Sequence, residues 1–155
     1  MSAILEEPML HLRPMTQGDV AVVHALEQRA YDFPWTRGIF EDCLRAGYCC
    51  WVLELDGEVI GYSILSVAAG ESHLLNLCVA PEMQGKGLGR HLLKRMLELA
   101  RYHHADTVFL EVRLSNRTAI HLYETMGFNE IGMRHRYYPA RDGKREDALI
   151  MALML

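Results

Sequence analysis

Apolar residues recur every three or four positions in the middle of the chain, and charged residues fall between them. Leu88, Leu92, Met96 and Ala100 lie on one stripe, which predicts an amphipathic helix over about 88–103. This is the clearest helical pattern in the sequence. We expect its apolar side to pack on a sheet and its charged side to face water.

Three further segments have a helical period, and each has recognisable ends. Thr16 and Asp19 form a capping box at the start of the first segment, Thr36 can cap the second, and Asn116 can cap the third, which ends at Gly127. The predicted helices cover about 16–31, 36–44 and 116–126.

Short apolar or alternating runs, bounded by turn residues, predict strands. The pair Asp56-Gly57 between two such runs is typical of a hairpin turn. The predicted strands cover about 9–13, 48–55, 59–67, 74–79, 107–112, 131–138 and 148–155. Strands and helices follow one another in an order that indicates an α/β (α+β) domain, with a mixed seven-stranded sheet flanked by about four helices.

The length and composition are typical of one globular domain. The chain has 155 residues, of which 50% are hydrophobic and 23% charged, so we expect a single domain over residues 1–155. The N-terminal stretch MSAILEEPML has no basic segment before a long apolar run, which argues against a secretory signal, and no apolar run reaches membrane-spanning length. We therefore expect a cytoplasmic protein with no membrane partner.

Charge is distributed unevenly along the chain. The net charge of -4 argues against a direct nucleic-acid partner. Residues 1–80 hold 4 Lys and Arg against 11 Asp and Glu, whereas residues 81–155 hold 12 against 9. The second half suits an anion and the first half a cationic substrate, although uneven solvated surface charge explains the counts equally well. No feature of the sequence specifies an oligomeric state.

Cysteine and histidine residues have no metal-binding spacing. The four cysteines form no CxxC pair, and we expect buried free thiols at Cys43, Cys49, Cys50 and Cys78. The eight histidines include no H-E-x-x-H motif, and several occupy predicted surface positions: His73, His91, His121 and His135. We expect no metal ion.

The segment QGKGLG, Gln84 to Gly89, opens the longest predicted helix, and three interpretations compete for it. Helix N-termini bind phosphates, and glycines let the main chain approach closely. A Walker loop requires Ser or Thr after the lysine, but Lys86 is followed by Gly87. A dinucleotide-binding loop is partly matched, but its third glycine comes one residue early. Glycines that only permit a tight turn are the third interpretation.

Other motifs favour a more specific interpretation. The pattern Q-x-x-G-x-G after a strand, at Gln84, Gly87 and Gly89, resembles the acetyl-CoA loop of the GNAT superfamily of N-acetyltransferases, and the predicted element order is similar to theirs. Five other motifs resemble the RimI family, whose members acetylate the N-terminal alanine of a small-subunit ribosomal protein: EQRAYDFPW, LEVRLSN, LYETMGF, YYP and REDALIMAL. The resemblance covers nearly the whole chain and implies the GNAT fold, with acetyl-CoA as cosubstrate.

The resemblance also implies how the coenzyme binds. Main-chain N–H groups of the loop would hold the diphosphate of coenzyme A, from Gln84, Gly85, Lys86, Gly87, Leu88, Gly89 and Arg90. Arg117 would help Lys86 and Arg90 to attract phosphates, and Asn116 would contact the pantetheine arm. The strand before the loop would bind the same arm through Leu77, Cys78 and Val79. The Val79 N–H is the candidate oxyanion donor, and the Cys78 thiol is expected to be packed rather than nucleophilic.

Two residues match the catalytic groups of the family. Glu111 matches the general base, acting directly or through water, and Tyr123 matches the general acid that protonates the leaving thiolate. Alternatively, Glu111 is a strand-end carboxylate paired with Arg113. Asn116 and Tyr123 are two helical turns apart and share a face, so one coenzyme arm could touch both. Asn116 could also serve only as a helix cap.

The residues expected to bind the acceptor substrate are predicted from the family resemblance alone. The motifs around Phe33, Pro34 and Trp35, and around Tyr137 and Tyr138, are expected to bind the N-terminus of a ribosomal protein, although the two tyrosines could equally be ordinary sheet aromatics. Two rival functions stay open. One is acetylation of lysine or a small amine, and the other is an acyl-CoA-binding sensor without turnover.

Overall fold

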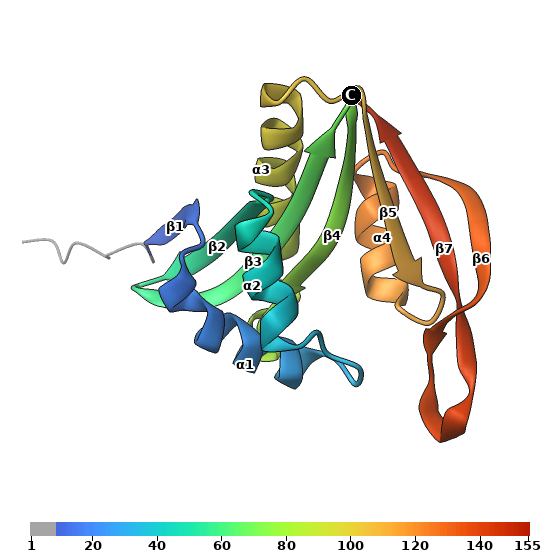
Figure 1. Cartoon of the computed structure of the whole chain (residues 1–155), viewed down its shortest axis with the longest axis horizontal. Coiled ribbons are helices and arrows are strands. Elements are labelled where there is room, and N and C mark those ends of the chain that lie inside the picture. Colours follow the sequence, from blue (N-terminus) through green and yellow to red (C-terminus); the bar gives the residue numbers. More distant parts are fainter. Residues whose placement is uncertain (1–8) are drawn as a thin grey trace, which may run out of the picture.

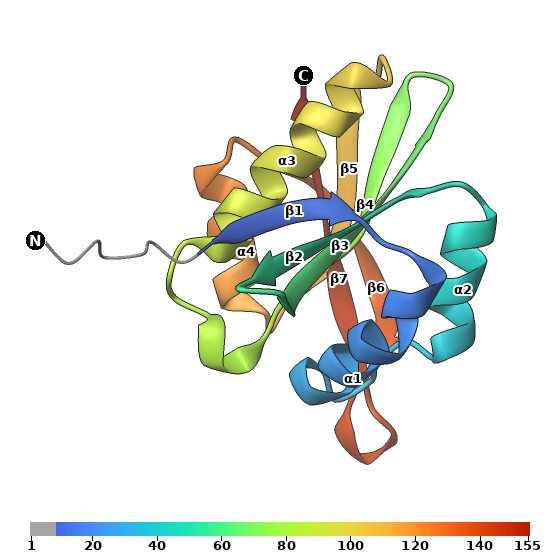
Figure 2. The same ribbon diagram turned by 90° about the vertical axis from the view of Figure 1, so that its left-hand side faces the viewer.

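The computed structural model describes residues 9–155, so most of the N-terminal stretch tested above for a signal lies outside the described residues. A mixed sheet forms the middle layer and helices cover both of its faces (Figures 1 and 2). The strands are β1 (Leu10–Pro14), β2 (Cys49–Leu55), β3 (Glu58–Ala68), β4 (Glu71–Val79), β5 (Thr107–Arg113), β6 (Asn129–Pro139) and β7 (Arg145–Met154). The helices are α1 (Val20–Ala30), α2 (Arg37–Arg45), α3 (Leu88–Tyr102) and α4 (Arg117–Thr125).

The strand order is β1-β2-β3-β4-β5-β7-β6, and neighbouring strands are antiparallel except for β4 and β5. A parallel pair needs a long crossover, which α3 supplies. Within residues 9–155 the sheet has seven strands and there are four α-helices, as the sequence predicted. The predicted α/β fold class is therefore confirmed.

Two apolar cores lie on opposite faces of the sheet. On one face α1 and α2 cover β2, β3 and β4, and the fully buried side chains include Val23, Phe40 and Tyr62. On the other face α3 and α4 cover β3, β4, β5 and β7, with Met96 and Met151 fully buried. Figure 2 shows the two helix pairs on either side of the sheet. The amphipathic stripe of α3 is buried as its spacing predicted.

Some predicted strand ends were wrong. β4 begins at Glu71 rather than Leu74, because Ala69 and Gly70 form a two-residue turn from β3 in which both φ angles are positive, 52° and 81°. Because alanine rarely adopts a positive φ, the sequence did not indicate a turn at this position. β7 begins at Arg145 rather than at residue 148, and Pro139 of β6 pairs with Arg145, so the loop between these strands covers only residues 140–144.

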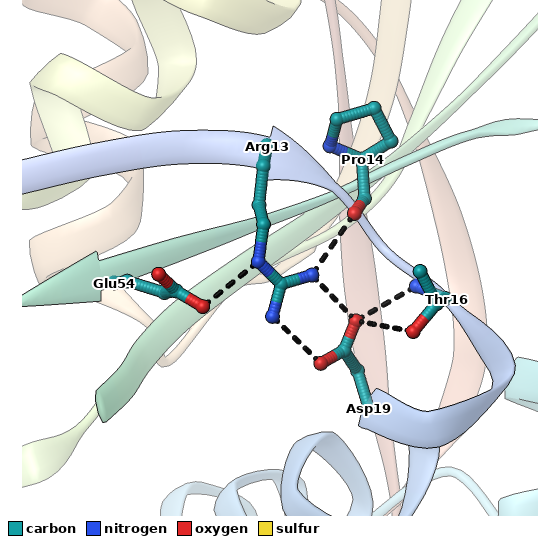
Figure 3. A network of polar contacts seen from close by, with 5 residues as sticks. All are labelled: Arg13, Pro14, Thr16, Asp19 and Glu54. Carbon is teal, nitrogen blue, oxygen red and sulfur yellow. Dashed lines mark hydrogen bonds and ion pairs between the residues drawn. The ribbon is translucent and has the colours of Figure 1, made fainter. Parts of the chain in front are cut away.

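A polar network fixes β1 to the start of the first helical segment (Figure 3). Arg13 donates hydrogen bonds to both carboxylate oxygens of Asp19, at 2.7 and 2.8 Å, and to Glu54 on β2 at 2.8 Å. Asp19 also accepts from the Thr16 main-chain N–H at 2.7 Å, in the predicted capping box. The hydrogen bonds from Arg13 lower the pKa of Asp19 to about 2.

Candidate active site

The candidate site lies where β4 and β5 separate. The two strands pair from Glu71 to Leu74 on β4, and the pairing then ends. At that point β4 has a bulge at Leu75, which shifts its register against β3 and bends the strand. The two ribbons diverge below the paired segment in Figure 1. A cleft of about 1020 Å³ opens between them.

The cleft brings together most of the predicted site residues. Those that line it are Phe33, Trp35, Leu77, Cys78, Val79, Gln84, Gly85, Gly87, Leu88, Gly89, Arg90, Glu111, Asn116, Tyr123 and Tyr138. Four residues that the sequence singled out are exposed and lie outside its lining: Pro34, Lys86, Arg117 and Tyr137. The lining residues come from segments up to about a hundred positions apart, so the fold is what assembles the cleft.

The glycine loop meets the cleft with unpaired donors. Gly85 and Gly87 have φ angles of 79° and 80°, which glycine adopts without strain. Within the described residues, no main-chain N–H from Gly85 to Arg90 donates to another protein group. The Gln84 N–H differs, because it is directed to the Pro81 carbonyl at 3.4 Å. The loop thus presents a row of free N–H groups at the positive end of the α3 dipole, an arrangement that attracts phosphate.

The basic side chains near the loop have different surroundings. Arg90 donates to the Thr125 hydroxyl at 2.7 Å and contacts the Met126 sulfur at 3.2 Å, so its guanidinium lies at the C-terminal end of α4. A cation there complements the negative end of that helix. Lys86 is exposed and projects from the loop itself.

The main chain of β4 is accessible after the bulge. The Ala80 N–H donates to the Ile60 carbonyl on β3 at 2.8 Å. Because neighbouring residues of an antiparallel strand point their polar groups in opposite directions, Leu77 and Val79 direct theirs away from β3. On that side β5 has already diverged, so these groups face the cleft.

Side chains satisfy the carbonyls of this strand edge and leave its N–H groups free. Tyr31 donates its hydroxyl proton to the Leu77 carbonyl at 2.9 Å, and the Gln84 side-chain amide donates to the Val79 carbonyl at 3.1 Å. The N–H groups of Leu77 and Val79 have no protein acceptor on the cleft side in the described chain. The edge therefore offers donors to a ligand that carries carbonyl oxygens.

The thiol of Cys78 faces the opposite side of β4. It is buried among the residues of the α1 and α2 core, and burial raises its pKa to about 11. A thiol that keeps its proton is a poor nucleophile. The other cysteines are free as well: Cys49 is half-buried, and Cys43 and Cys50 are buried.

Asn116 and Tyr123 share the cleft face of α4. The Asn116 side-chain oxygen accepts from the Ala119 N–H at 3.2 Å, so it caps the helix while it lines the cleft. Tyr123 is 7% exposed, and its ring packs edge-on against Phe128 with 5.7 Å between centroids. Its hydroxyl forms no hydrogen bond with the described residues and is free to meet a ligand. Burial raises the pKa of this phenol above its usual value.

Glu111 lies on β5 beyond the point where β4 departs. Its carboxylate pairs with Arg134 of β6 at 3.2 Å and keeps 29% of its side-chain surface exposed. The alternative pairing with Arg113 was wrong, because Arg113 bonds to Glu146 at 3.1 Å instead. A partly exposed carboxylate on the wall of the cleft can take a proton directly or through water.

The acceptor side of the cleft is assembled around Arg113. Its guanidinium lies over the ring of Tyr138 at 4.5 Å and over the ring of Phe33 at 5.2 Å, and it donates to the Pro139 carbonyl at 2.7 Å. Phe33 belongs to the segment 31–36 between α1 and α2, which we call the acceptor loop. One arginine thus links β5, β6 and the acceptor loop.

Sequence reasoning missed several residues of the cleft. Arg113 was considered only as a partner of Glu111, and Tyr31 and Asn76 were not singled out. Glu27 had a detectable signal, because it falls on the apolar stripe of α1 with Val20 and Val23, where a carboxylate is out of place.

The described residues also contain no group of three or more His, Cys, Asp or Glu side chains that could hold a metal ion. No helix in residues 9–155 is long and apolar enough to cross a membrane. The histidines expected at the surface are exposed: His73, His91, His121 and His135.

The glycine-rich helix start beside the separating strands β4 and β5 is the arrangement expected from the resemblance to the GNAT superfamily, and the comparisons agree. Residues 20–128 match the model of the Acetyltransferase (GNAT) family. The chain belongs to this family, as its sequence motifs predicted.

Its relatives narrow the class. The chain is 42% identical over 135 residues to the ribosomal protein bS18-alanine N-acetyltransferase of Escherichia coli K12, covering 87% of this chain and 90% of that protein. It is 34% identical to the protein of the same name from Haemophilus ducreyi, covering 93% and 99% of the two chains. The crystal structure of the ribosomal-protein-S18-alanine N-acetyltransferase from E. coli superposes with a TM-score of 0.88 and 39% identity, covering 94% of each chain.

Proposed function

We propose that this chain transfers the acetyl group of acetyl-CoA to the N-terminal alanine of ribosomal protein bS18. The observation that carries the proposal is the 42% identity to the E. coli bS18-alanine N-acetyltransferase over 90% of that protein's length. A substrate that is a ribosomal protein is consistent with a reaction in the cytoplasm. The acetylation of lysine or of a small amine is the rival activity.

The cleft supports a direct transfer in a ternary complex. The free N–H groups of the glycine loop would hold the coenzyme diphosphate, and the Leu77 and Val79 N–H groups would bind its arm and the thioester oxygen. This arrangement polarises the carbonyl without a covalent enzyme intermediate. The buried Cys78 thiol, with its raised pKa, does not favour a ping-pong route.

Two side chains would move protons. Glu111 would accept the proton that the attacking amine loses, and Tyr123 would donate its phenolic proton to the departing sulfur. The position of Tyr123 in the cleft lining and its unbonded hydroxyl support this role, and burial keeps the phenol protonated by raising its pKa. An α-amine, with a pKa of about 7.8, needs less help from a base than a lysine with a pKa of about 10.4.

A substrate panel tests the proposal. Peptides with the bS18 N-terminal sequence, with the same N-terminus blocked, and with an internal lysine alone are incubated with acetyl-CoA and analysed by mass spectrometry. We expect acetylation only of the free N-terminal alanine. Acetylation of the blocked peptide at lysine, or of small amines alone, would contradict the N-terminal assignment.

A second measurement separates an enzyme from an acyl-CoA sensor. The substitution Glu111→Gln removes the base but keeps the volume, so we expect kcat/KM for the peptide to fall about a hundredfold. Acetyl-CoA affinity, measured by calorimetry, should stay within about twofold because the glycine loop is unchanged. A wild-type protein that binds acetyl-CoA but acetylates no peptide above background, as the variant would, would favour the sensor.

A further inference from the structure

Glu27 is a buried carboxylate to which the catalytic scheme assigns no role. It is 2% exposed, lies in the last turns of α1 and lines the cleft. Its Oε1 accepts from the Tyr62 hydroxyl at 2.6 Å and from the Asn76 side-chain amide at 2.9 Å. Its Oε2 accepts from the Trp35 main-chain N–H at 2.8 Å. A buried carboxylate with three donors has a fixed orientation.

The three donors belong to three different elements. Trp35 is in the acceptor loop, Asn76 directly follows the bulge of β4, and Tyr62 is on the central strand β3. Glu27 is therefore the junction between the loop expected to meet the acceptor and the strand edge expected to meet the thioester. Its neighbour one turn on, Tyr31, bonds to the same strand through the Leu77 carbonyl.

We infer that Glu27 is a positioning residue, which holds the acceptor loop at a fixed place relative to the free N–H groups of β4 and thereby sets the affinity for the acceptor peptide. The part of this inference that concerns peptide affinity rests on the proposed function. Glu27 would act through Trp35 and Asn76 and would not itself touch the reacting atoms.

The chemistry of the junction explains which substitutions matter. A main-chain N–H cannot turn toward another partner without moving the loop, so Trp35 depends on an acceptor at this position. Glu27→Met keeps the approximate volume and removes every acceptor. Glu27→Gln keeps one oxygen for Trp35, and Asn76 can rotate its amide to accept from the new side-chain amide. The conservative variant is therefore expected to restore function.

Steady-state kinetics give the first readout. For E27M we expect the KM of the peptide to rise about tenfold, the scale of a lost hydrogen bond to a charged group. Its acetyl-CoA affinity should change less than about twofold, because the glycine loop does not contact Glu27. The peptide KM of E27Q should lie within about threefold of the wild-type value. Tyr62→Phe removes a hydrogen bond from the same carboxylate but leaves the bond from Trp35, so its peptide KM should lie within about twofold of wild type.

Hydrogen exchange gives a readout that needs no substrate. The chain has 2 tryptophans, so selective nitrogen-15 labelling yields two main-chain amide signals, with Trp51 of β2 as an internal reference. In E27M the Trp35 amide should exchange at least about tenfold faster than in wild type, and in Tyr62→Phe less than about twofold faster. The Trp51 amide should be unchanged in both.

The outcomes are distinct. If the wild-type chain does not acetylate the peptide, the proposed function fails, while the exchange data still test the loop. If the wild type is active but E27M keeps its peptide KM or its slow Trp35 exchange, the inference is wrong. A similar rise in KM in Tyr62→Phe would mean a general loss of stability and would also overturn it. If E27M is too unstable to purify, the double variant E27M/Y62F is used in its place, because it also removes the phenol hydroxyl that E27M leaves buried without a partner.

Discussion

The two sides of the cleft differ in the groups that they present, main-chain N–H groups on one side and side chains on the other. The coenzyme side comes mainly from one continuous stretch, residues 77–90, and presents mostly main-chain N–H groups. The acceptor side combines side chains from α1, the acceptor loop, β5 and β6, which are far apart in the sequence. A main-chain site depends on φ angles and glycines, whereas a side-chain site depends on pairs that fold together. The two sides should therefore respond to different substitutions.

The largest effect is expected where the two sides meet, at Tyr123. Tyr123→Phe keeps the ring packed on Phe128 and removes only the hydroxyl. We expect kcat to fall about a hundredfold, with little change in the KM of either substrate. Because burial raises the pKa of this phenol, wild-type activity should persist through about pH 10, where an ordinary tyrosine loses its proton. A pH-rate profile of both proteins checks this, and a wild-type decline near pH 10 would contradict it.

The coenzyme side should respond to a glycine substitution. Gly87→Ala places a side chain at φ 80°, which costs about 1–2 kcal/mol. We expect acetyl-CoA affinity to fall about tenfold in calorimetry because the N–H groups turn away from the coenzyme. The matched control is Gly57→Ala in the β2–β3 turn, at φ 85°, where an added Cβ also meets open space. Equal loss of coenzyme affinity in both variants would mean that only stability had changed.

The acceptor side should respond to a change at its central arginine. Arg113→Lys keeps the charge but loses the planar group that lies over Phe33 and Tyr138. We expect the peptide KM to rise about fivefold, while acetyl-CoA affinity stays unchanged. If coenzyme affinity falls as much as peptide affinity, the division of the cleft into two sides is wrong.

The smallest effect on activity is expected outside both sides, in the network of Figure 3. Asp19→Asn removes the charge partner of Arg13 and should lower the free energy of unfolding at pH 7 by about 1 kcal/mol. The pKa of Asp19 is lowered to about 2 in the folded state, so its stabilisation is present above about pH 4 and is lost as the pH falls toward 2. Denaturant unfolding at several pH values should show that the free energy of unfolding falls less steeply toward acid pH in the variant than in wild type. The kcat/KM at pH 7 should be unchanged.

The coenzyme side was the more predictable of the two. Gln84, Gly87 and Gly89 are close in sequence, and their spacing pointed to a loop at a helix start. The roles of Arg113 and Glu27 were not predicted because their partners are distant in the sequence. Arg113 contacts Phe33, 80 positions away, and Glu27 bonds to Asn76, 49 positions away. Local patterns carry no information about such pairs.

The sequence by itself determined the elements and the family. Apolar spacing defined the four helices and seven strands, and the glycine loop with its accompanying motifs indicated a GNAT acetyltransferase, because these signals depend on neighbours along the chain.

Only the tertiary structure decided where β4 leaves β5, which carbonyls of β4 are satisfied by Tyr31 and Gln84, and which acids pair with which arginines. The physical reason is that a bulge, an exposed strand edge and a buried ion or hydrogen-bond network each depend on segments that the chain brings together only when it folds.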